Sequence, residues 1–336
     1  INSGISRMTS YILLEKIRVE DANCIAGFTY GFPAITGFLG FTHALSRKFN
    51  AEFGIEIIGC AIFSHDFTLH TNEQYDVRFI QSKRPPVTLQ GQKYRAEANK
   101  TPPIIEEGKM DLTVSLLLQC KQVLSGADEQ KNIYKNSLKK WVYQARLAGG
   151  SIPNIKNISF WTEESNINKL KRKLLPSFVL LDATSALEKH VEQSKINHPN
   201  SDFFDLWTDF FAYKAESKID EDQQTVQWVR KDKPNPRGWF VPLMIGFKGI
   251  SPLYNGQDVE HHRDPQYPFR FVESVHSIGE WRSTHRIQNL SDLIWTYHIE
   301  DEWYLCQQNQ QFQTEIEPIE QLQPASNNDG AFNYDF

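Results

Sequence analysis

Short runs of alternating or continuous hydrophobic residues dominate the first third of the chain and predict several strands. β-branched, aromatic and leucine side chains concentrate in these runs, as is typical of strands that are buried on one or both faces. The segments that share this pattern are 11–14, 17–19, 55–70 and 109–120.

Helical spacing of hydrophobic residues appears between these runs. The first helix is marked by side chains three or four positions apart, Phe38, Phe41, Leu45 and Phe49. This spacing predicts a helix over residues 35–49 with Thr36 as its N-cap. A second helix is expected over 131–147, ending at Gly149 and Gly150.

The order strand, helix, strand, strand, helix suits a ferredoxin-like or RRM-like αβ sandwich, whose unit is β-α-β-β-α-β. An open sheet of that kind commonly exposes one face to single-stranded RNA. The pattern therefore predicts an α+β class and raises RNA binding as a candidate function.

The second half of the chain is less regular. A basic helix is expected from residue 166 until Pro176 breaks it, followed by a buried strand at 178–181. Residues 187–224 are expected to be helical and acidic, and two strands are expected around a turn at 234–238. From residue 301 onward the sequence becomes a polar, Gln- and Asn-rich tail.

Residues 81–108 interrupt the pattern with two Pro-Pro pairs and many cations between two strand-like segments. A loop of this length inside a compact domain is usually functional or disordered. The arrangement predicts an extended hairpin, or thumb, that projects from the sheet.

Composition excludes several classes of protein. The 336 residues include 40% hydrophobic and 23% charged side chains, as in ordinary soluble globular proteins. No apolar run approaches the roughly 18 to 20 residues of a membrane helix, and no signal peptide is expected. The cysteines, Cys24, Cys60, Cys120 and Cys306, are far apart. Their spacing fits a reducing cytoplasm and predicts neither disulfides nor a zinc cluster. The pair His261–His262 is expected to be solvated, so no metal and no cofactor is expected.

The net charge of −5 excludes a uniformly basic nucleic-acid binder, but the charge is unevenly distributed. The segment between residues 131 and 173 contains ten Lys or Arg residues and only two acidic residues, Glu163 and Glu164. A protein can hold a nucleic acid locally while remaining acidic overall. Solvated helix faces would give the same pattern.

The segment Arg146-Leu-Ala-Gly-Gly-Ser admits two interpretations from its residues alone. Gly149 and Gly150 can end a helix, with Arg146 favourably placed at the helix C-terminus. Alternatively, a backbone without side chains beside a cation can approach phosphate oxygens. Both interpretations can hold together.

Several blocks resemble one family, the second Csy subunit of the type I-F CRISPR surveillance complex. They occur in the family's order across nearly the whole chain. The blocks are GFPAITGFLGFTHAL (31–45), IIEEGKMDLTVSLLL (104–118), RLAGGSI (146–152), KRKLLPSFVL (171–180), GWFVPL (238–243), ISPLY (250–254) and FRFVESVHSIGEWRSTHRIQNLSDLIWTYH (269–298).

The resemblance implies a modified ferredoxin-like/RRM-like sandwich with a projecting thumb hairpin and a large helical insertion. The implied organisation is a core over 9–160 with the thumb at about 81–108, a mainly helical insertion over 161–225, C-terminal strands and a helix over 226–300, and a tail over 301–336.

The same resemblance implies a protein without catalytic activity. It implies binding to the repeat-derived 5′ handle of the guide RNA and pairing with the large first Csy subunit. It further implies contact with the adjacent backbone subunit and a position near the PAM of the target DNA, where base pairing reads the target and protein reads the PAM.

RNA contacts are then expected from the thumb, from the glycine segment, from the segment around residue 285 and from one aromatic ring. The expected residues are Lys83, Arg84, Lys93, Tyr94, Arg95, Lys100, Arg146, Gly149, Gly150, Ser151, Arg282, His285, Arg286 and Phe32. Tyr94 suits base stacking, worth roughly 1–3 kcal/mol per base. Arg282 and Arg286 would repel each other on one helix face unless an anion lay between them. Phe32 and Trp281 also fit core packing.

Two other functions remain open at this stage. A repeat-processing endoribonuclease would need a histidine base, for which His43, His65 and His285 are candidates, although His43 lies in an apolar helix and is expected in the core. A stand-alone single-stranded RNA-binding protein would lack the fixed-length guide RNA and the partner subunits.

Overall fold

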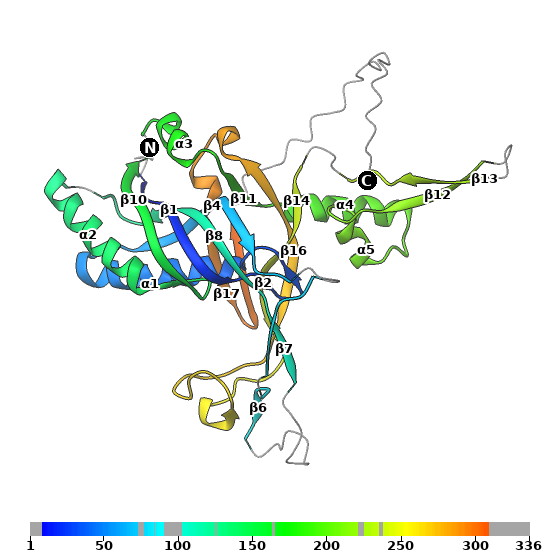
Figure 1. The fold of residues 1–336 in the computed structure, drawn as a ribbon, viewed down its shortest axis with the longest axis horizontal. Helices are drawn as coiled ribbons and strands as arrows, with labels where there is room; N and C mark the ends of the chain where they lie inside the picture. Colours follow the sequence, from blue (N-terminus) through cyan, green and yellow to red (C-terminus); the bar gives the residue numbers. More distant parts are fainter. Residues whose placement is uncertain are drawn as a thin grey trace, which may run out of the picture.

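The computed structural model describes residues 9–72, 77–83, 85–90, 103–124, 126–162, 165–220, 225–234 and 238–308. These residues form an α+β fold whose main element is a ten-stranded antiparallel sheet (Figure 1). The expected α+β class is therefore confirmed.

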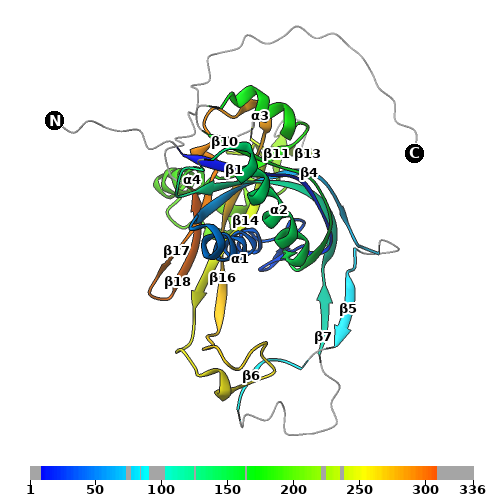
Figure 2. The same ribbon diagram turned by 90° about the vertical axis from the view of Figure 1, so that its left-hand side faces the viewer.

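The N-terminal half follows the expected order of strand, helix, strand, strand, helix and strand. Its elements are β1 (Ser10–Asn23), α1 (Ile35–Phe53), β4 (Ile57–Leu69), β8 (Lys109–Cys120), α2 (Asp128–Gln144) and β10 (Gly150–Thr162). Within the sheet these strands lie in the order β4-β8-β1-β10. Both helices pack on the same face of this part of the sheet (Figure 2).

The apolar face of α1 consists of the residues whose spacing predicted the helix. Phe38, Leu45 and Phe49 are fully buried against the sheet and against α2. The helix begins at Ile35, and its N-cap is Ala34, which makes no side-chain capping bond. The expectation that Thr36 caps the helix was wrong, because the chain enters helical geometry at Ile35, directly after Ala34, and Thr36 lies inside the first turn.

The opposite face of the same strands is covered only in part. Alternating residues of β1 point to opposite faces, so Tyr11 and Leu13 lie away from α1. Helix α3 (Ile167–Leu174) packs Leu170 and Leu174 on these side chains. The expected basic helix before Pro176 is thus confirmed.

The C-terminal half adds strands that return to β4. They are β11 (Phe178–Asp182), β14 (Phe240–Gly249), β16 (Val272–Ser283), β17 (Trp295–Glu300) and β18 (Trp303–Gln308). Sheet order runs β11-β16-β14-β18-β17-β4, and β11 also pairs with β4. These strands therefore follow one another around a closed ring that shares β4 with the N-terminal half.

A buried polar contact holds this ring together. The Gln308 side-chain amide donates to the carbonyls of Leu180 (3.2 Å) and Leu293 (2.8 Å), and its Oε1 accepts from the amide of Asp182 (2.8 Å). Trp295 Nε1 donates to the same Leu180 carbonyl at 3.0 Å. The sheet therefore extends to Gln308, beyond the boundary at residue 300 where a polar tail was expected.

The segment expected to be helical over 187–224 contains less helix than predicted. It holds α4 (Thr184–Asn197) and α5 (Phe203–Thr208), and then a ribbon in which β12 (Ala215–Asp220) pairs with β13 (Thr225–Arg230). The two strands expected on either side of residues 234–238 are present as β13 and β14, but they do not pair with each other, because β13 pairs with β12 while β14 pairs with β16 and β18.

Two arms project from the sheet and meet (Figure 2). In the first, β5 (Ile80–Lys83) pairs antiparallel with β7 (Ile104–Glu107), as expected for a thumb hairpin. In the second, β15 (Val259–Glu260) pairs with β6 (Thr88–Leu89) of the first arm. Sequence patterns did not predict this second arm. No helix among the described residues is long and apolar enough to cross a membrane.

Replacing Gln308 by alanine is expected to lower the free energy of unfolding by about 2–4 kcal/mol, because the buried Leu293 carbonyl and the Asp182 amide lose their partner. Urea denaturation measures this change. Gln307→Ala is the matched control, since Gln307 is exposed on the same strand and should change stability by less than about 0.5 kcal/mol. Equal losses in both variants would contradict a structural role for Gln308.

Candidate nucleic-acid interface

The segment Arg146–Ser151 is a β-hairpin rather than the end of a helix. Helix α2 ends at Gln144, and β9 (Arg146–Leu147) pairs with Gly150 and Ser151 at the start of β10. The turn residues Ala148 (φ 48°) and Gly149 (φ 80°) both have positive φ, as in a two-residue type I′ turn. The expectations of a helix to residue 147 and of a glycine helix stop were wrong, because strand pairing competes with helix extension here.

The two glycines have different surroundings. A Cβ on Gly149 would meet no atom within 4 Å, so this position is open to a ligand. A Cβ on Gly150 would lie 2.6 Å from Val19 Cγ1 and 2.7 Å from the carbonyl oxygen of Glu20. Gly150 is therefore required for the close approach of β10 to β1.

The cation and the hydroxyl of this hairpin are exposed. Arg146 Nη1 donates a hydrogen bond to the Gly149 carbonyl at 3.3 Å, and this bond links the first strand of the hairpin to its turn. Ser151 is exposed and lies opposite Glu20 in the register of β1 and β10. Of the four expected contacts, Arg146, Gly149 and Ser151 are placed where a ligand can reach them.

The base of the thumb is less basic than its sequence indicates. Lys83 is exposed on β5, but β7 brings Glu106 and Glu107 to the same two-stranded ribbon. Ser82 Oγ donates to Glu107 Oε1 at 2.8 Å. The other expected thumb contacts, Arg84, Lys93, Tyr94, Arg95 and Lys100, lie outside the described residues.

Phe32 packs within the protein. Its ring stacks on Phe38 at a centroid distance of 5.6 Å and meets Trp281 edge-on at 4.9 Å. These contacts join the loop before α1 to strand β16. The described contacts of Phe32 and Trp281 are thus those of core packing.

Arg282, His285 and Arg286 are not on one helix face. Arg282 lies on β16 and forms an ion pair with Glu280 through Nη2 and Nε. His285 and Arg286 are exposed in the short 3-10 helix η2 (Thr284–Arg286). The expected repulsion between Arg282 and Arg286 at helical spacing therefore does not apply, because β16 remains a strand through Ser283.

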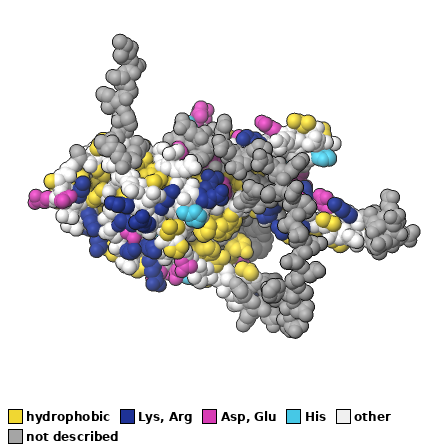
Figure 3. Space-filling model, turned by 90° about the horizontal axis from the view of Figure 1, so that it is seen from above, with side chains coloured by type: hydrophobic (Ala, Val, Ile, Leu, Met, Phe, Trp, Pro, Cys, Tyr) yellow, Lys and Arg dark blue, Asp and Glu magenta, His cyan; other side chains and the backbone are white. Residues whose placement is uncertain are grey.

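Basic side chains outside the expected set gather near η2. Lys171 of α3 donates from Nζ to the His285 carbonyl at 3.1 Å, which joins the two elements. Figure 3 shows Lys and Arg side chains concentrated where α2, β10 and α3 lie. The cation-rich segment 131–173 signalled this gathering in the sequence, but no single residue in it could be selected before α3 was placed.

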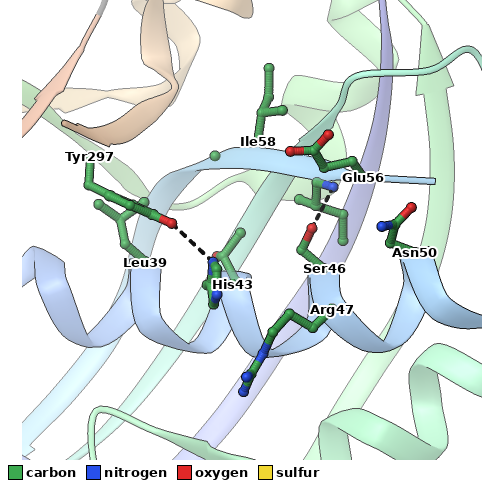
Figure 4. A pocket seen from close by; sticks show the side chains of 11 residues that line it. Leu39, His43, Ser46, Arg47, Asn50, Glu56, Ile58 and Tyr297 are labelled. Atoms are coloured by element: carbon green, nitrogen blue, oxygen red, sulfur yellow. Dashed lines mark hydrogen bonds between the residues drawn. The ribbon is translucent and has the colours of Figure 1, made fainter. Parts of the chain in front are cut away.

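The three candidate histidines occupy different elements. His43 is exposed on α1, so the expectation that it lies in the core was wrong. Its Nδ1 lies 3.1 Å from Tyr297 Oη at the edge of a hollow of about 370 Å³ (Figure 4). His285 Nδ1 lies 2.9 Å from Ser283 Oγ.

His65 is held on both sides by the protein. Its Nδ1 lies 2.9 Å from the Pro176 carbonyl, and its Nε2 lies 2.7 Å from Ser115 Oγ. A carbonyl can only accept, so Nδ1 carries the proton and the Ser115 hydroxyl donates to Nε2. Burial lowers the pKa of His65, and the charge of Lys16 lowers it further. These contacts describe a neutral structural histidine.

Asp21, His70 and Asp111 form a cluster that the sequence did not reveal. His70 lies 3.2 Å from Asp111 and 3.6 Å from Asp21, and the three come from different parts of the chain. Exposed acidic groups of this kind are common without a metal ion, so the cluster does not establish a metal site.

Gly150→Ala is expected to lower the free energy of unfolding by about 2 kcal/mol or more, because its methyl group would collide with the β1 backbone. Gly149→Ala should lower the free energy of unfolding by only about 1 kcal/mol, because the new side chain meets no neighbouring atom and only the left-handed backbone conformation is unfavourable. Thermal and urea denaturation of both variants tests this order. A larger loss for Gly149→Ala would contradict the described packing of the hairpin.

Stability should fall as the pH drops from about 7 to 5, partly through His65. Its pKa is lowered in the folded protein, so the unfolded chain takes up a proton first, near the ordinary histidine pKa of about 6.5. The contribution is present above that pH and is lost below it. His65→Gln, which does not titrate, should flatten the urea midpoint against pH. An unchanged profile would contradict this role.

Comparison with known proteins agrees with the resemblance seen in the sequence. Residues 12–306 match the model of the family described as CRISPR-associated protein (Cas_Csy2). The chain is 31% identical over 312 residues to CRISPR-associated protein Csy2 of Pseudomonas aeruginosa (strain UCBPP-PA14), covering 86% of this chain and 91% of that protein. The chain therefore belongs to the Csy2 family of CRISPR-associated proteins.

Proposed function

We propose that this protein is the non-catalytic RNA-binding subunit of a type I-F CRISPR surveillance complex. It binds the repeat-derived 5′ handle of the guide RNA, pairs with the large first Csy subunit, contacts the adjacent backbone subunit and supports PAM-dependent recognition of target DNA. Membership of the Csy2 family is the observation that carries this proposal.

The fold supports RNA binding through the order and placement of its strands. The sheet order β4-β8-β1-β10, with α1 and α2 on one face, is compatible with a ferredoxin-like, RRM-type unit. We assign the N-terminal half to that class. In such units the sheet face opposite the helices serves single-stranded RNA.

Exposed polar and basic side chains around this unit supply the contacts. Arg146 and Ser151 on the β9–β10 hairpin, Lys83 on the thumb, and His285 and Arg286 on η2 are accessible to a phosphate backbone. Arg282 contributes less, because Glu280 already occupies its guanidinium. Thumb contacts from residues 84–100 remain part of the proposal.

The histidines do not favour the endoribonuclease alternative. His65 is neutralised by burial between Pro176 and Ser115, while His43 and His285 lie on separate elements and contact Tyr297 and Ser283. The four cysteines are buried and unpaired, and burial raises the pKa of Cys60, Cys120 and Cys306 to about 12. Unreactive free thiols are compatible with the proposed cytoplasmic location.

Co-expression with the other subunits of its complex is expected to yield one assembly that carries guide RNA of fixed length. The purified protein alone should leave precursor repeat RNA intact, because the proposed role needs no bond cleavage. Mass measurement of the assembly and gel analysis of its RNA test both statements.

His285→Ala is the control for the cleavage assay. Cleavage that depends on the wild-type protein and disappears in His285→Ala would favour the endoribonuclease. Binding to RNA of mixed length without partner subunits would favour a stand-alone RNA-binding protein.

A further inference from the structure

We propose that a cationic hollow around Glu15 binds one phosphate group of an RNA backbone. The hollow measures about 460 Å³ and lies where α3 stops covering the sheet, between Lys16, Lys156, Arg172 and Lys173. None of these residues belongs to the contacts expected from the sequence. The inference rests on the proposed function, because it names an additional contact for the same RNA.

A bulge in β1 creates the site. The register between β1 and β8 shifts between Leu14 and Ile17, and Lys16 has a φ of 49°. The Lys16 amide donates to Ser115 Oγ at 2.8 Å, and the Ser115 hydroxyl in turn donates to His65. Consecutive residues of a regular strand point to opposite faces, whereas this bulge brings both Glu15 and Lys16 to the rim of the hollow.

Glu15 holds two of the cations in place. Its side chain is only 4% exposed, and its carboxylate lies 2.8 Å from Lys156 Nζ and 3.8 Å from Lys173 Nζ. A buried carboxylate is tolerated when such partners compensate its desolvation. Lysines fixed in this way lose less side-chain entropy when they bind a second anion.

The charge of the hollow exceeds what Glu15 can balance. Four cations and one carboxylate give a formal charge of +3. Among the described residues, Lys16 and Arg172 have no carboxylate partner. Lys135 approaches the same rim and donates to Asn157 Oδ1 at 2.8 Å. Such convergent donors fit an anionic group with several oxygens.

The chemistry of the walls favours a phosphate over a base. The described lining contains one apolar side chain, Leu175, and no aromatic ring on which a base could stack. Lys171, beside Arg172 on α3, is bonded to the His285 carbonyl of η2. An RNA strand that contacts His285 and Arg286 can therefore continue past Lys171 to the cations of the hollow.

The test combines Lys16→Gln with Arg172→Gln, because neither side chain balances Glu15 and folding should be preserved. The probe is a fluorescently labelled single-stranded RNA that carries the CRISPR repeat of the same genome. Affinity is measured across a series of salt concentrations. The double variant should bind about tenfold more weakly, and its slope of log affinity against log salt should shrink by about 0.7, the value for one lost phosphate contact.

Lys195→Gln is the matched control, since Lys195 is exposed on α4, away from the hollow, and should leave affinity and slope unchanged. Arg172→Gln alone replaces the double variant if the latter fails to fold, as judged by melting temperature. Wild-type affinity and slope in a folded variant would overturn the phosphate site and leave the proposed function intact. Loss of a co-purified partner subunit with unchanged RNA affinity would overturn it in favour of a protein contact. Absence of RNA binding by the wild-type protein would overturn both proposals.

Discussion

Strand β4 is the constraint on which the arrangement of both halves depends. One of its edges pairs with β8, while the other pairs with β17 at Cys60 and with β11 at Phe63 and Ser64. Because β17 and β11 pair with neighbouring positions on the same edge of β4, they must separate from each other near that edge. Gly59 permits this approach, because a Cβ there would collide with the Trp295 carbonyl. The hydrogen bonds of Trp295 and Gln308 to the Leu180 carbonyl then hold β17, β18 and β11 around the junction.

This junction determines where the charged surface lies. Because β11 is fixed on β4, helix α3, which precedes it, is fixed on the sheet face opposite α1 and α2. Along β1, Leu13 is the last apolar side chain on that face, and the bulge that contains Glu15 and Lys16 follows it. Helix η2 is held beside α3 by the bonds of Thr284 to Ser177. Lysine and arginine side chains therefore gather at the edge of the sheet area that α3 covers, although the net charge of the protein is −5.

Local patterns predicted the elements whose periodicity is sustained, namely α1, β8 and the order of the N-terminal half. They failed where long-range pairing competes with local preference. Ala148 adopts a positive φ that its identity does not indicate, so the hairpin at residue 149 resembled a helix end. Gln308 looks like part of a polar tail, yet its buried amide satisfies backbone groups that lie more than a hundred residues away. The hollow around Glu15 was equally hard to predict. The density of Lys and Arg marked the segment 131–173, but neither the spacing nor the composition of the sequence indicates the bulge at Lys16.

Internal carboxylates divide the candidate cations into two groups. Arg282 is balanced by Glu280, and Lys83 has Glu106 and Glu107 on the neighbouring strand. An anion that binds such a cation gains less, because an existing ion pair must be weakened or a carboxylate approached. Lys16 and Arg172 have no ion pair to weaken among the described residues, and Glu15 restrains the lysines beside them without cancelling the charge of the hollow. Electrostatics alone therefore ranks the hollow above the thumb base and above Arg282 as a place for a phosphate.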